Sequence, residues 1–437
     1  MSSPNYSQLE QKSWNAPTIK HALAGTVELP GSKSLTNREL VLSALAATPS
    51  EIVAPLESRD SALMIQALSN LGSQITSTKQ KGNLEIMPAP SDMKVNTEIN
   101  CGLAGTVMRF VPPIAGLFQG EIHFDGDEAA RKRPMQTTID SLRKLGVEVI
   151  AEGDGLPFTI RSNGSIEGGD LEIDASSSSQ FVSGLLLAAP RFTKGLKLSH
   201  IGKDLPSLPH IAMTLATLRN RGVNAIQTSE TSWEVQPGAI QGKQVVIEPD
   251  LSNAGPFMAA ALVLGGTVTI KNWPIETTQV GKQFIPILTN MGAEITRNGS
   301  DLVVSGNKSI TGIEIDMSEA GELAPVIIAL ATLANSESRI TGIGHLRGHE
   351  TNRLEALTTE INKIGGRATE LEDGIAITPT ANLHGGEWET YGDHRMATAA
   401  AIIGLAVPDI TVKNIEVVSK TMPKFVSLWN QMLGLSN

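Results

Sequence analysis

The stretch with the clearest chemical potential is residues 29–46, LPGSKSLTNRELVLSALA, where a hydroxyl-rich turn comes directly before an apolar helical pattern. Serine and threonine cap helices, and the unpaired N–H groups and dipole of a helix start attract anions. Lys33 and Arg38 add two positive charges at the same end. The stretch therefore predicts a corner that binds phosphate or carboxylate. A well-capped helix with two exposed cations is the alternative.

This corner is not a nucleotide-binding P-loop. That motif needs a glycine directly before its lysine and another glycine five residues earlier, whereas Ser32 precedes Lys33 here. The sequence predicts an anion site of a different kind.

Composition limits the classes of partner. The chain has 437 residues, more than a single core usually serves, so two or three domains are expected. Its net charge is −10 and only 4% of its residues are aromatic, which argues against nucleic acid and anionic membranes as partners.

The single cysteine, Cys101, excludes a disulfide framework and fits a reducing compartment. The first eighteen residues hold no apolar signal core and no eighteen apolar residues run together, so a cytoplasmic protein is expected.

A helix-ending pattern, apolar residues followed by glycine and a β-type run, returns along the whole chain. Each glycine suits the left-handed position that ends a helix. Successive copies are 69 to 76 residues apart, which indicates a sixfold internal repeat. The marker glycines are Gly72, Gly146, Gly222, Gly292, Gly365 and, in a weaker copy, Gly434.

Each repeat also holds an earlier helix that opens with a polar turn and continues with small apolar residues. Such helices are apolar on most faces and should be buried, so the repeat is an α/β unit. Six units in two groups of three predict two similar domains, residues 31–247 and residues 1–30 plus 248–437, with crossovers near 30–31 and 247–249. Helix starts of both groups would then converge on one cleft for a polyanionic small molecule. The polar turns lie in residues 31–38, 101–109, 174–183, 249–257, 316–325 and 392–396.

Seven motifs in order resemble the 5-enolpyruvylshikimate-3-phosphate synthase family: LPGSKSLTNREL, AGTVMRF, RKRPMQTTIDSLRKLG, SSSSQFVSGLLLAAP, RGHETNRL, YGDHRMA and SKTMPKF. The resemblance runs from about Val27 to the C-terminus. It implies a two-domain inside-out α/β barrel, built from six βαβαββ units with three in each domain. It also implies a monomer without cofactor or metal.

The reaction that the resemblance implies transfers the enolpyruvyl group of phosphoenolpyruvate to the 5-hydroxyl of shikimate-3-phosphate, with release of phosphate. This step belongs to the shikimate pathway to chorismate and aromatic amino acids. The positions implied for phosphoenolpyruvate are Lys33, Gly105, Thr106, Arg133, Gln180, Arg353, Arg395 and Lys420. Those implied for shikimate-3-phosphate are Lys33, Ser34, Arg38, Ser178, Ser179, Gln180, Ser207, Glu322 and His349.

Catalysis needs a base for the 5-hydroxyl and a proton for C3 of phosphoenolpyruvate. Glu322, where the family usually has aspartate, is the candidate base, and Lys33 and Glu350 are the candidates for delivering and recovering the C3 proton. An acid in a first helical turn that complements the dipole is the alternative role for Glu322.

Several positions depart from the more familiar form of the family: His345, His349, Asn352, Leu103, Phe110 and His210. They bear on the shikimate-3-phosphate contacts and on the response to glyphosate, the inhibitor that takes the phosphoenolpyruvate site of this family. Gly105 and Thr106 are retained, which favours sensitivity.

Three other readings are open to test. The related enolpyruvyl transferase that acts on UDP-N-acetylglucosamine carries a reactive cysteine on a loop that here, at residues 125–134, has none. A zinc protease motif from His349 fails because Arg353 stands where its second histidine must be. A binding protein without turnover is disfavoured by the retention of Lys33, Glu322 and Glu350.

Overall fold

The computed structural model describes residues 12–78, 80, 82–90 and 93–435. The polar start of the chain, residues 1–11, and with it part of the second predicted domain, lies outside the described residues. By its internal contacts the chain divides into two compact units. The inserted unit comprises Pro30–Asp250 and Glu276–Val280, and the terminal unit comprises the chain up to Leu29, Leu251–Ile275 and the chain from Gly281 onward. That these units behave as two domains stays a prediction.

The inserted unit holds three repeats of one βαβαββ pattern. The first consists of β14 (Gln244–Val246), α1 (Lys33–Ala44), β3 (Ser50–Val53), α2 (Arg59–Asn70), β4 (Gln74–Ser77) and β5 (Leu84–Met87). The second consists of β6 (Thr97–Asn100), α3 (Gly105–Ala115), β7 (Gln119–Asp125), the short α4 (Glu128–Arg131), α5 (Gln136–Lys144), β8 (Glu148–Ala151) and β9 (Phe158–Asn163). The third consists of β10 (Gly169–Ile173), α6 (Ser179–Ala188), β11 (Leu196–His200), α7 (Leu208–Asn220), β12 (Ala225–Ser229) and β13 (Ser232–Val235).

The terminal unit repeats the pattern, although the sheet of its third repeat has three strands in the described chain. Its first repeat consists of β2 (Leu23–Val27), α8 (Leu251–Leu264), β15 (Gly266–Ile270), α9 (Phe284–Asn290), β16 (Glu294–Asn298) and β17 (Asp301–Gly306). The second consists of β18 (Glu314–Asp316), α10 (Ala324–Thr332), β19 (Ser338–Thr341), α11 (Arg353–Lys363), β20 (Ala368–Glu370) and β21 (Ile375–Ile377). The third consists of β22 (Gly386–Trp388), α12 (His394–Gly404), β23 (Ile410–Val412), α13 (Phe425–Met432) and β1 (Trp14–Asn15).

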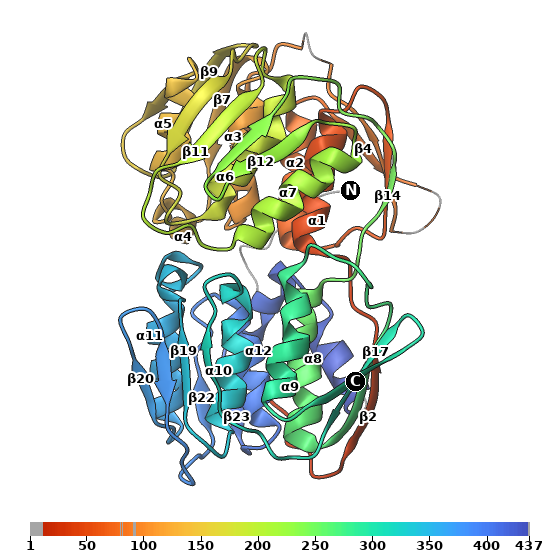
Figure 1. The fold of residues 1–437 in the computed structure, drawn as a ribbon, viewed down its shortest axis with the longest axis vertical. Coiled ribbons are helices and arrows are strands. Elements are labelled where there is room, and N and C mark those ends of the chain that lie inside the picture. Colours follow the sequence, from red (N-terminus) through yellow and green to blue (C-terminus); the bar gives the residue numbers. More distant parts are fainter. Residues whose placement is uncertain (1–11, 79, 81, 91–92, 436–437) are drawn as a thin grey trace. The chain divides into compact units, whose positions relative to one another are not determined.

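Each sheet combines a parallel pair with antiparallel neighbours. In the sheet β6-β7-β9-β8, for example, β6 and β7 are parallel and β9 pairs antiparallel with both β7 and β8. Two sheets take their first strand from a distant part of the chain: β14 pairs in parallel with β3, and β2 pairs in parallel with β15. Figure 1 shows β2, drawn in red, within a unit whose other labelled elements are green to blue.

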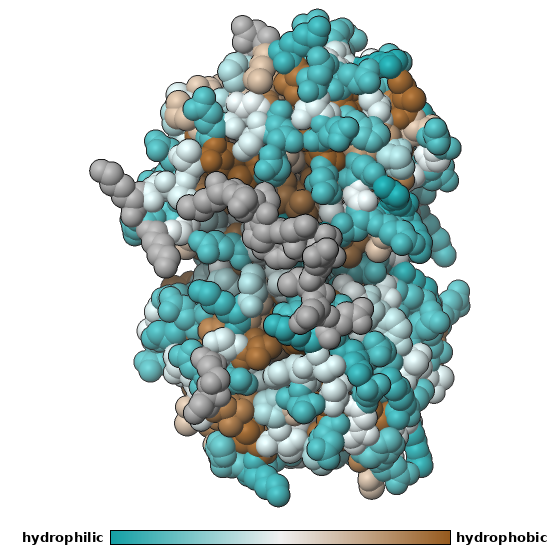
Figure 2. Space-filling model, turned by 180° about the vertical axis from the view of Figure 1, so that it is seen from behind, coloured by the Kyte–Doolittle hydropathy of each residue, from teal (hydrophilic) through white to brown (hydrophobic). Residues whose placement is uncertain are grey.

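Buried helices form the centre of each unit. In the inserted unit α1, α3 and α6 contact one another, and in the terminal unit α8, α10 and α12 do so. Every residue of α3 and α10 is buried, because apart from Arg109 and the threonines the side chains of these helices are small or apolar. The surface seen in Figure 2 is mostly hydrophilic, with hydrophobic patches interrupted by polar residues.

All six marker glycines have positive φ, between 72° at Gly434 and 109° at Gly292. Their predicted role in ending helices is confirmed, because a side chain at a left-handed position would be strained. The predicted α/β fold class is also confirmed. Among the described residues no helix is long and apolar enough to cross a membrane.

Candidate active site

The predicted anion corner lies at the start of α1. Ser32 caps the helix, its hydroxyl accepting from the backbone N–H of Leu35 at 3.5 Å, as expected from the sequence. The ammonium of Lys33 lies 3.5 Å from a carboxylate oxygen of Asp60, whose side chain is only 3% exposed. The backbone N–H of Lys33 donates to Asp250 at 3.0 Å. The lysine side chain, 23% exposed, is thus oriented by a buried carboxylate while part of it stays accessible.

Arg38 is buried, with 1% of its surface exposed. Its guanidinium donates to the hydroxyl of Thr214 at 2.8 Å and to the carbonyl of His210 at 2.9 Å, both on α7. It also lies over the ring of Phe110, 5.3 Å from the centroid. Arg38 therefore connects α1, α3 and α7, a structural role that its sequence position did not reveal. Its contact with a substrate stays a prediction.

Three residues predicted for phosphoenolpyruvate lie together in the inserted unit. A Cβ atom on Gly105 would lie 2.9 Å from Oε1 of Gln180 and 3.2 Å from both terminal nitrogens of Arg133. Within the described part of the chain, Oε1 of Gln180 and Nε of Arg133 are buried without a hydrogen-bond partner. Because buried polar groups are nearly always paired, this group of residues has unused hydrogen-bonding capacity for a ligand. Thr106, next in α3, accepts from the amide of Asn37 at 2.7 Å.

The serine-rich turn precedes α6 as predicted. Ser178 caps the helix by accepting from the N–H of Gln180 at 3.2 Å, and Ser179 is its first residue. Ser207 precedes α7 in a left-handed conformation with φ of 58°, and its hydroxyl makes no capping bond. With Ser34 in the first turn of α1, the predicted shikimate-3-phosphate serines are thus found at three helix starts of one unit.

A second group of predicted residues surrounds Arg353 in the terminal unit. Its Nε donates to Oδ2 of Asp393 at 2.7 Å and its Nη2 to Oδ1 at 3.2 Å, and Nη2 also donates to Glu350 at 2.9 Å. Burial alone would lower the pKa of Arg353, but the carboxylates of Asp393 and Glu350 outweigh it and raise this pKa. Arg353, only 2% exposed, is therefore a fixed cation.

Two further cations join this group. The ammonium of Lys420 contacts the other carboxylate oxygen of Glu350. The guanidinium of Arg395 donates to the carbonyl and hydroxyl of Ser252 at 2.9 and 2.8 Å, and its backbone N–H donates to Asp393 at 2.8 Å. Sequence reasoning missed Asp393 and Ser252. Asp393 could have been found from its place before an apolar helix, where aspartate is a common cap.

The candidate base Glu322 lies half-buried in the short 3₁₀ helix η4 (Gly321–Leu323) and interacts electrostatically with Arg353. His345 packs on the same helix, since a Cβ on Gly321 would lie 2.6 Å from its Nε2. Burial, helped by the charge of Arg353, lowers the pKa of His345 to about 4, so its ring is neutral. The ring of His349 lies 5.7 Å from that of His345, and its Nδ1 lies 3.3 Å from a guanidinium nitrogen of Arg353.

The structure explains three of the departures noted in the sequence. Asn352 caps α11, a task that asparagine and aspartate perform equally well. Leu103 acts through its backbone, because its carbonyl accepts from Arg133 at 3.4 Å. Phe110 is fully buried beneath Arg38.

Cys101 is buried too, and burial raises the pKa of its thiol to about 12, which does not suit a nucleophile.

Comparisons with known proteins agree with one another. A family model described as EPSP synthase (3-phosphoshikimate 1-carboxyvinyltransferase) matches residues 17–429. The 3-phosphoshikimate 1-carboxyvinyltransferase of Kocuria rhizophila is 53% identical over 433 residues, covering 96% of each chain. That of Tropheryma whipplei is 48% identical over 438 residues, covering 96% of this chain and 98% of the relative. A solved EPSP synthase from Acinetobacter baumannii has a TM-score of 0.80 at 25% identity, covering 97% of this chain and 98% of the other.

The sixfold repeat, the two groups of cations and these matches lead to the same result. Because the family model and the relatives cover nearly the whole chain, the resemblance is not confined to a shared motif. The chain belongs to the EPSP synthase family.

Proposed function

We propose that this protein transfers the enolpyruvyl group of phosphoenolpyruvate to the 5-hydroxyl of shikimate-3-phosphate and releases phosphate. It is a transferase of the shikimate pathway and a 3-phosphoshikimate 1-carboxyvinyltransferase, the activity named in the family and in its relatives. Its partners are the two small phosphorylated substrates.

The observation that carries the proposal is the group formed by Gly105, Arg133 and Gln180. A Cβ at Gly105 would displace the ends of the other two side chains, and both of these keep a buried polar atom without a partner in the described chain. A guanidinium, an amide and the backbone of a helix start are suited to a phosphate or carboxylate. Lys33 and Thr106 complete this share of the phosphoenolpyruvate contacts.

The terminal unit supplies the remaining contacts of phosphoenolpyruvate through Arg353, Arg395 and Lys420. Asp393 and Glu350 pair with Arg353, Glu350 pairs with Lys420, and Ser252 accepts from the guanidinium of Arg395, so the cations are held in place before any substrate arrives. Pre-organised charge of this kind stabilises a developing anion without reorganisation during the reaction. The proposed shikimate-3-phosphate contacts are Lys33, Ser34, Arg38, Ser178, Ser179, Gln180, Ser207, Glu322 and His349.

The addition step needs two proton transfers, and the elimination step needs a third. Glu322 takes the proton of the 5-hydroxyl while the hydroxyl oxygen bonds to C2 of phosphoenolpyruvate. At the same time C3 receives a proton from Lys33 or Glu350. The tetrahedral intermediate then loses a proton from C3 and expels phosphate. Glu350 is held in place for this exchange by its contacts with Lys420 and Arg353.

The test is phosphate release from phosphoenolpyruvate with shikimate-3-phosphate as acceptor, with UDP-N-acetylglucosamine in parallel. We expect release only with shikimate-3-phosphate, and a loss of at least 100-fold in kcat/KM for Lys33→Ala, the order expected when a positioned charge is removed. Lys132→Ala is the matched control, since the Lys132 side chain is 76% exposed and pairs with the surface residue Glu128. Release with the nucleotide sugar, or no release with either acceptor, would overturn the assignment.

We further propose that the protein is a cytoplasmic monomer. The single buried cysteine and the acidic composition support this proposal. Sedimentation velocity with and without substrates tests the monomer, and fractionation of the producing cells tests the location.

A further inference from the structure

Helix α11 contacts the turn before α12 at two places. At its start, Arg353 holds Asp393 through two hydrogen bonds. Seven residues later, Glu360 accepts from the hydroxyl of Tyr391 at 2.8 Å and from the backbone N–H of Glu389 at 3.1 Å. Residues seven apart lie two turns apart on the same face of a helix. One helix face therefore holds both ends of the segment 389–393.

The segment held in this way has an unusual backbone. Tyr391 and Gly392 are both left-handed, with φ of 53° and 71°. Glycine adopts this conformation readily, whereas a bulky residue such as tyrosine does so only when its surroundings impose it. The two left-handed residues turn the chain so that Asp393 can cap α12, accepting from the N–H of Arg395 at 2.8 Å. The position of Asp393 thus depends on the conformation of Tyr391.

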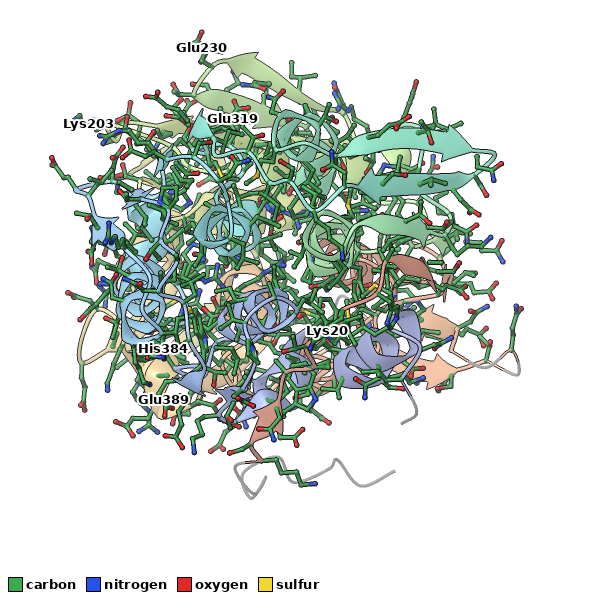
Figure 3. All side chains as sticks on the ribbon, turned by 90° about the horizontal axis from the view of Figure 1, so that it is seen from below. Lys20, Lys203, Glu230, Glu319, His384 and Glu389 are labelled. Carbon is green, nitrogen blue, oxygen red and sulfur yellow. The ribbon has the colours of Figure 1, made fainter. Side chains whose placement is uncertain are left out.

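Glu360 supplies the fixed end of this arrangement. Its side chain is 1% exposed, and its carboxylate is also contacted by Lys363 at 3.1 Å. Tyr391 is 44% exposed, but partial desolvation of its phenol and the hydrogen bond to Glu360 raise its pKa, so the phenol stays protonated and donates. The side chain of Glu389 is exposed and labelled at the edge of Figure 3, so its backbone rather than its carboxylate is what Glu360 holds.

We propose that Glu360 and Tyr391 are positioning residues for the reaction. Together they hold the 391–392 turn left-handed, and the turn places Asp393, which in turn orients Arg353 and the start of α12 with Arg395. Neither residue touches a substrate. The proposal rests on the proposed function for its kinetic consequence, but the hydrogen-bond arrangement itself can be tested without activity.

The first experiment is hydrogen exchange of the peptide that spans residues 386–396, in Glu360→Ala, Tyr391→Phe and Thr359→Ala. We expect at least tenfold faster exchange at Glu389 and Arg395 in the first variant and a smaller increase in the second. Thr359→Ala is the matched control, because Thr359 is an exposed residue of the same helix directly before Glu360, and it should exchange like the wild type. Unchanged exchange in Glu360→Ala would overturn the proposal whatever the enzyme does.

The second experiment is steady-state kinetics of the same variants. We expect Glu360→Ala to raise the KM for phosphoenolpyruvate about tenfold while the KM for shikimate-3-phosphate changes less than twofold. Glu360→Gln, whose amide oxygen can still accept from Tyr391 and Glu389, should recover most of the loss. Equal changes in both KM values, or no recovery with glutamine, would mean that Glu360 only stabilises the fold. A wild type without turnover would refute the proposed function and leave the exchange result valid.

Discussion

His345 is the residue whose surroundings change its chemistry most clearly. It packs against Gly321, beside the proposed base Glu322, and its Nε2 has no partner among the described residues. Burial and the nearby Arg353 lower its pKa to about 4. Because the ring is neutral, it adds no positive charge to the group that already holds Arg353, Arg395 and Lys420.

This low pKa makes stability depend on pH. An unfolded histidine titrates near 6.5, so between pH 6.5 and about 4 the unfolded chain binds a proton that the folded chain does not. The free energy of unfolding should therefore decrease as the pH falls through this window. The decrease is up to ~3 kcal/mol, at about 1.4 kcal/mol per pH unit. Urea unfolding at pH 7 and pH 4.5 measures the fall, and His345→Asn, which cannot titrate, should reduce it. An equal fall in both proteins would contradict the lowered pKa.

At the scale of elements, local patterns predicted helix ends better than helix partners. The six marker glycines were predictable because their left-handed backbone is a local requirement. Glu360 was not, since a glutamate in an amphipathic helix gives no sign that its side chain is buried against a turn thirty residues later. The pairing of β14 with β3 could not be predicted either, because the sequence of neither strand specifies its register with a distant partner.

Helix α11 offers a test of a departure that the sequence singled out. Asn352 caps this helix by accepting from the N–H of Glu355, and its amide also donates to the Glu355 side chain at 3.0 Å. Asn352→Ala should destabilise the terminal unit by about 1 kcal/mol, whereas Asn352→Asp should cost less than about 0.5 kcal/mol because it caps equally well. Thermal unfolding of the three proteins separates these outcomes. Equal losses in both variants would show that the amide, rather than the cap, is what matters.

At the scale of the whole molecule, the inserted unit depends on a buried ion pair. Arg221 and Glu39 lie 2.7 Å apart with side chains 0% and 3% exposed. Arg221 also donates to Ser43 at 2.8 Å and to Ser50 at 3.1 Å, which connects α7 with α1 and β3. Burial raises the pKa of Glu39 although Arg221 is its partner. Each buried charge therefore destabilises the fold unless the other is present.

Arg221→Met should therefore destabilise the inserted unit at pH 7 by about 3–5 kcal/mol, because it leaves a carboxylate buried without its partner. Trp233, 1% exposed, is the tryptophan of the inserted unit, whereas Trp14, Trp273, Trp388 and Trp429 belong to the terminal unit. Urea unfolding followed by fluorescence, compared with Trp233→Phe, assigns the affected transition. Adding Glu39→Gln to Arg221→Met should recover part of the loss. No recovery would mean that the lost hydrogen bonds, rather than the unpaired charge, cause the effect.

The distant strand pairings have a consequence for how the protein is made on the ribosome. Leu23 in β2 pairs with Gly266, and Trp14 in β1 pairs with Val412, so these early strands have no partners until hundreds of later residues are synthesised. At roughly 5–20 residues per second, β2 waits on the order of ten seconds or more for its neighbour. Apart from Glu276–Val280, the inserted unit is one continuous stretch ending at Asp250, so it can fold first, while the nascent chain still carries two unpaired strands at its leading end.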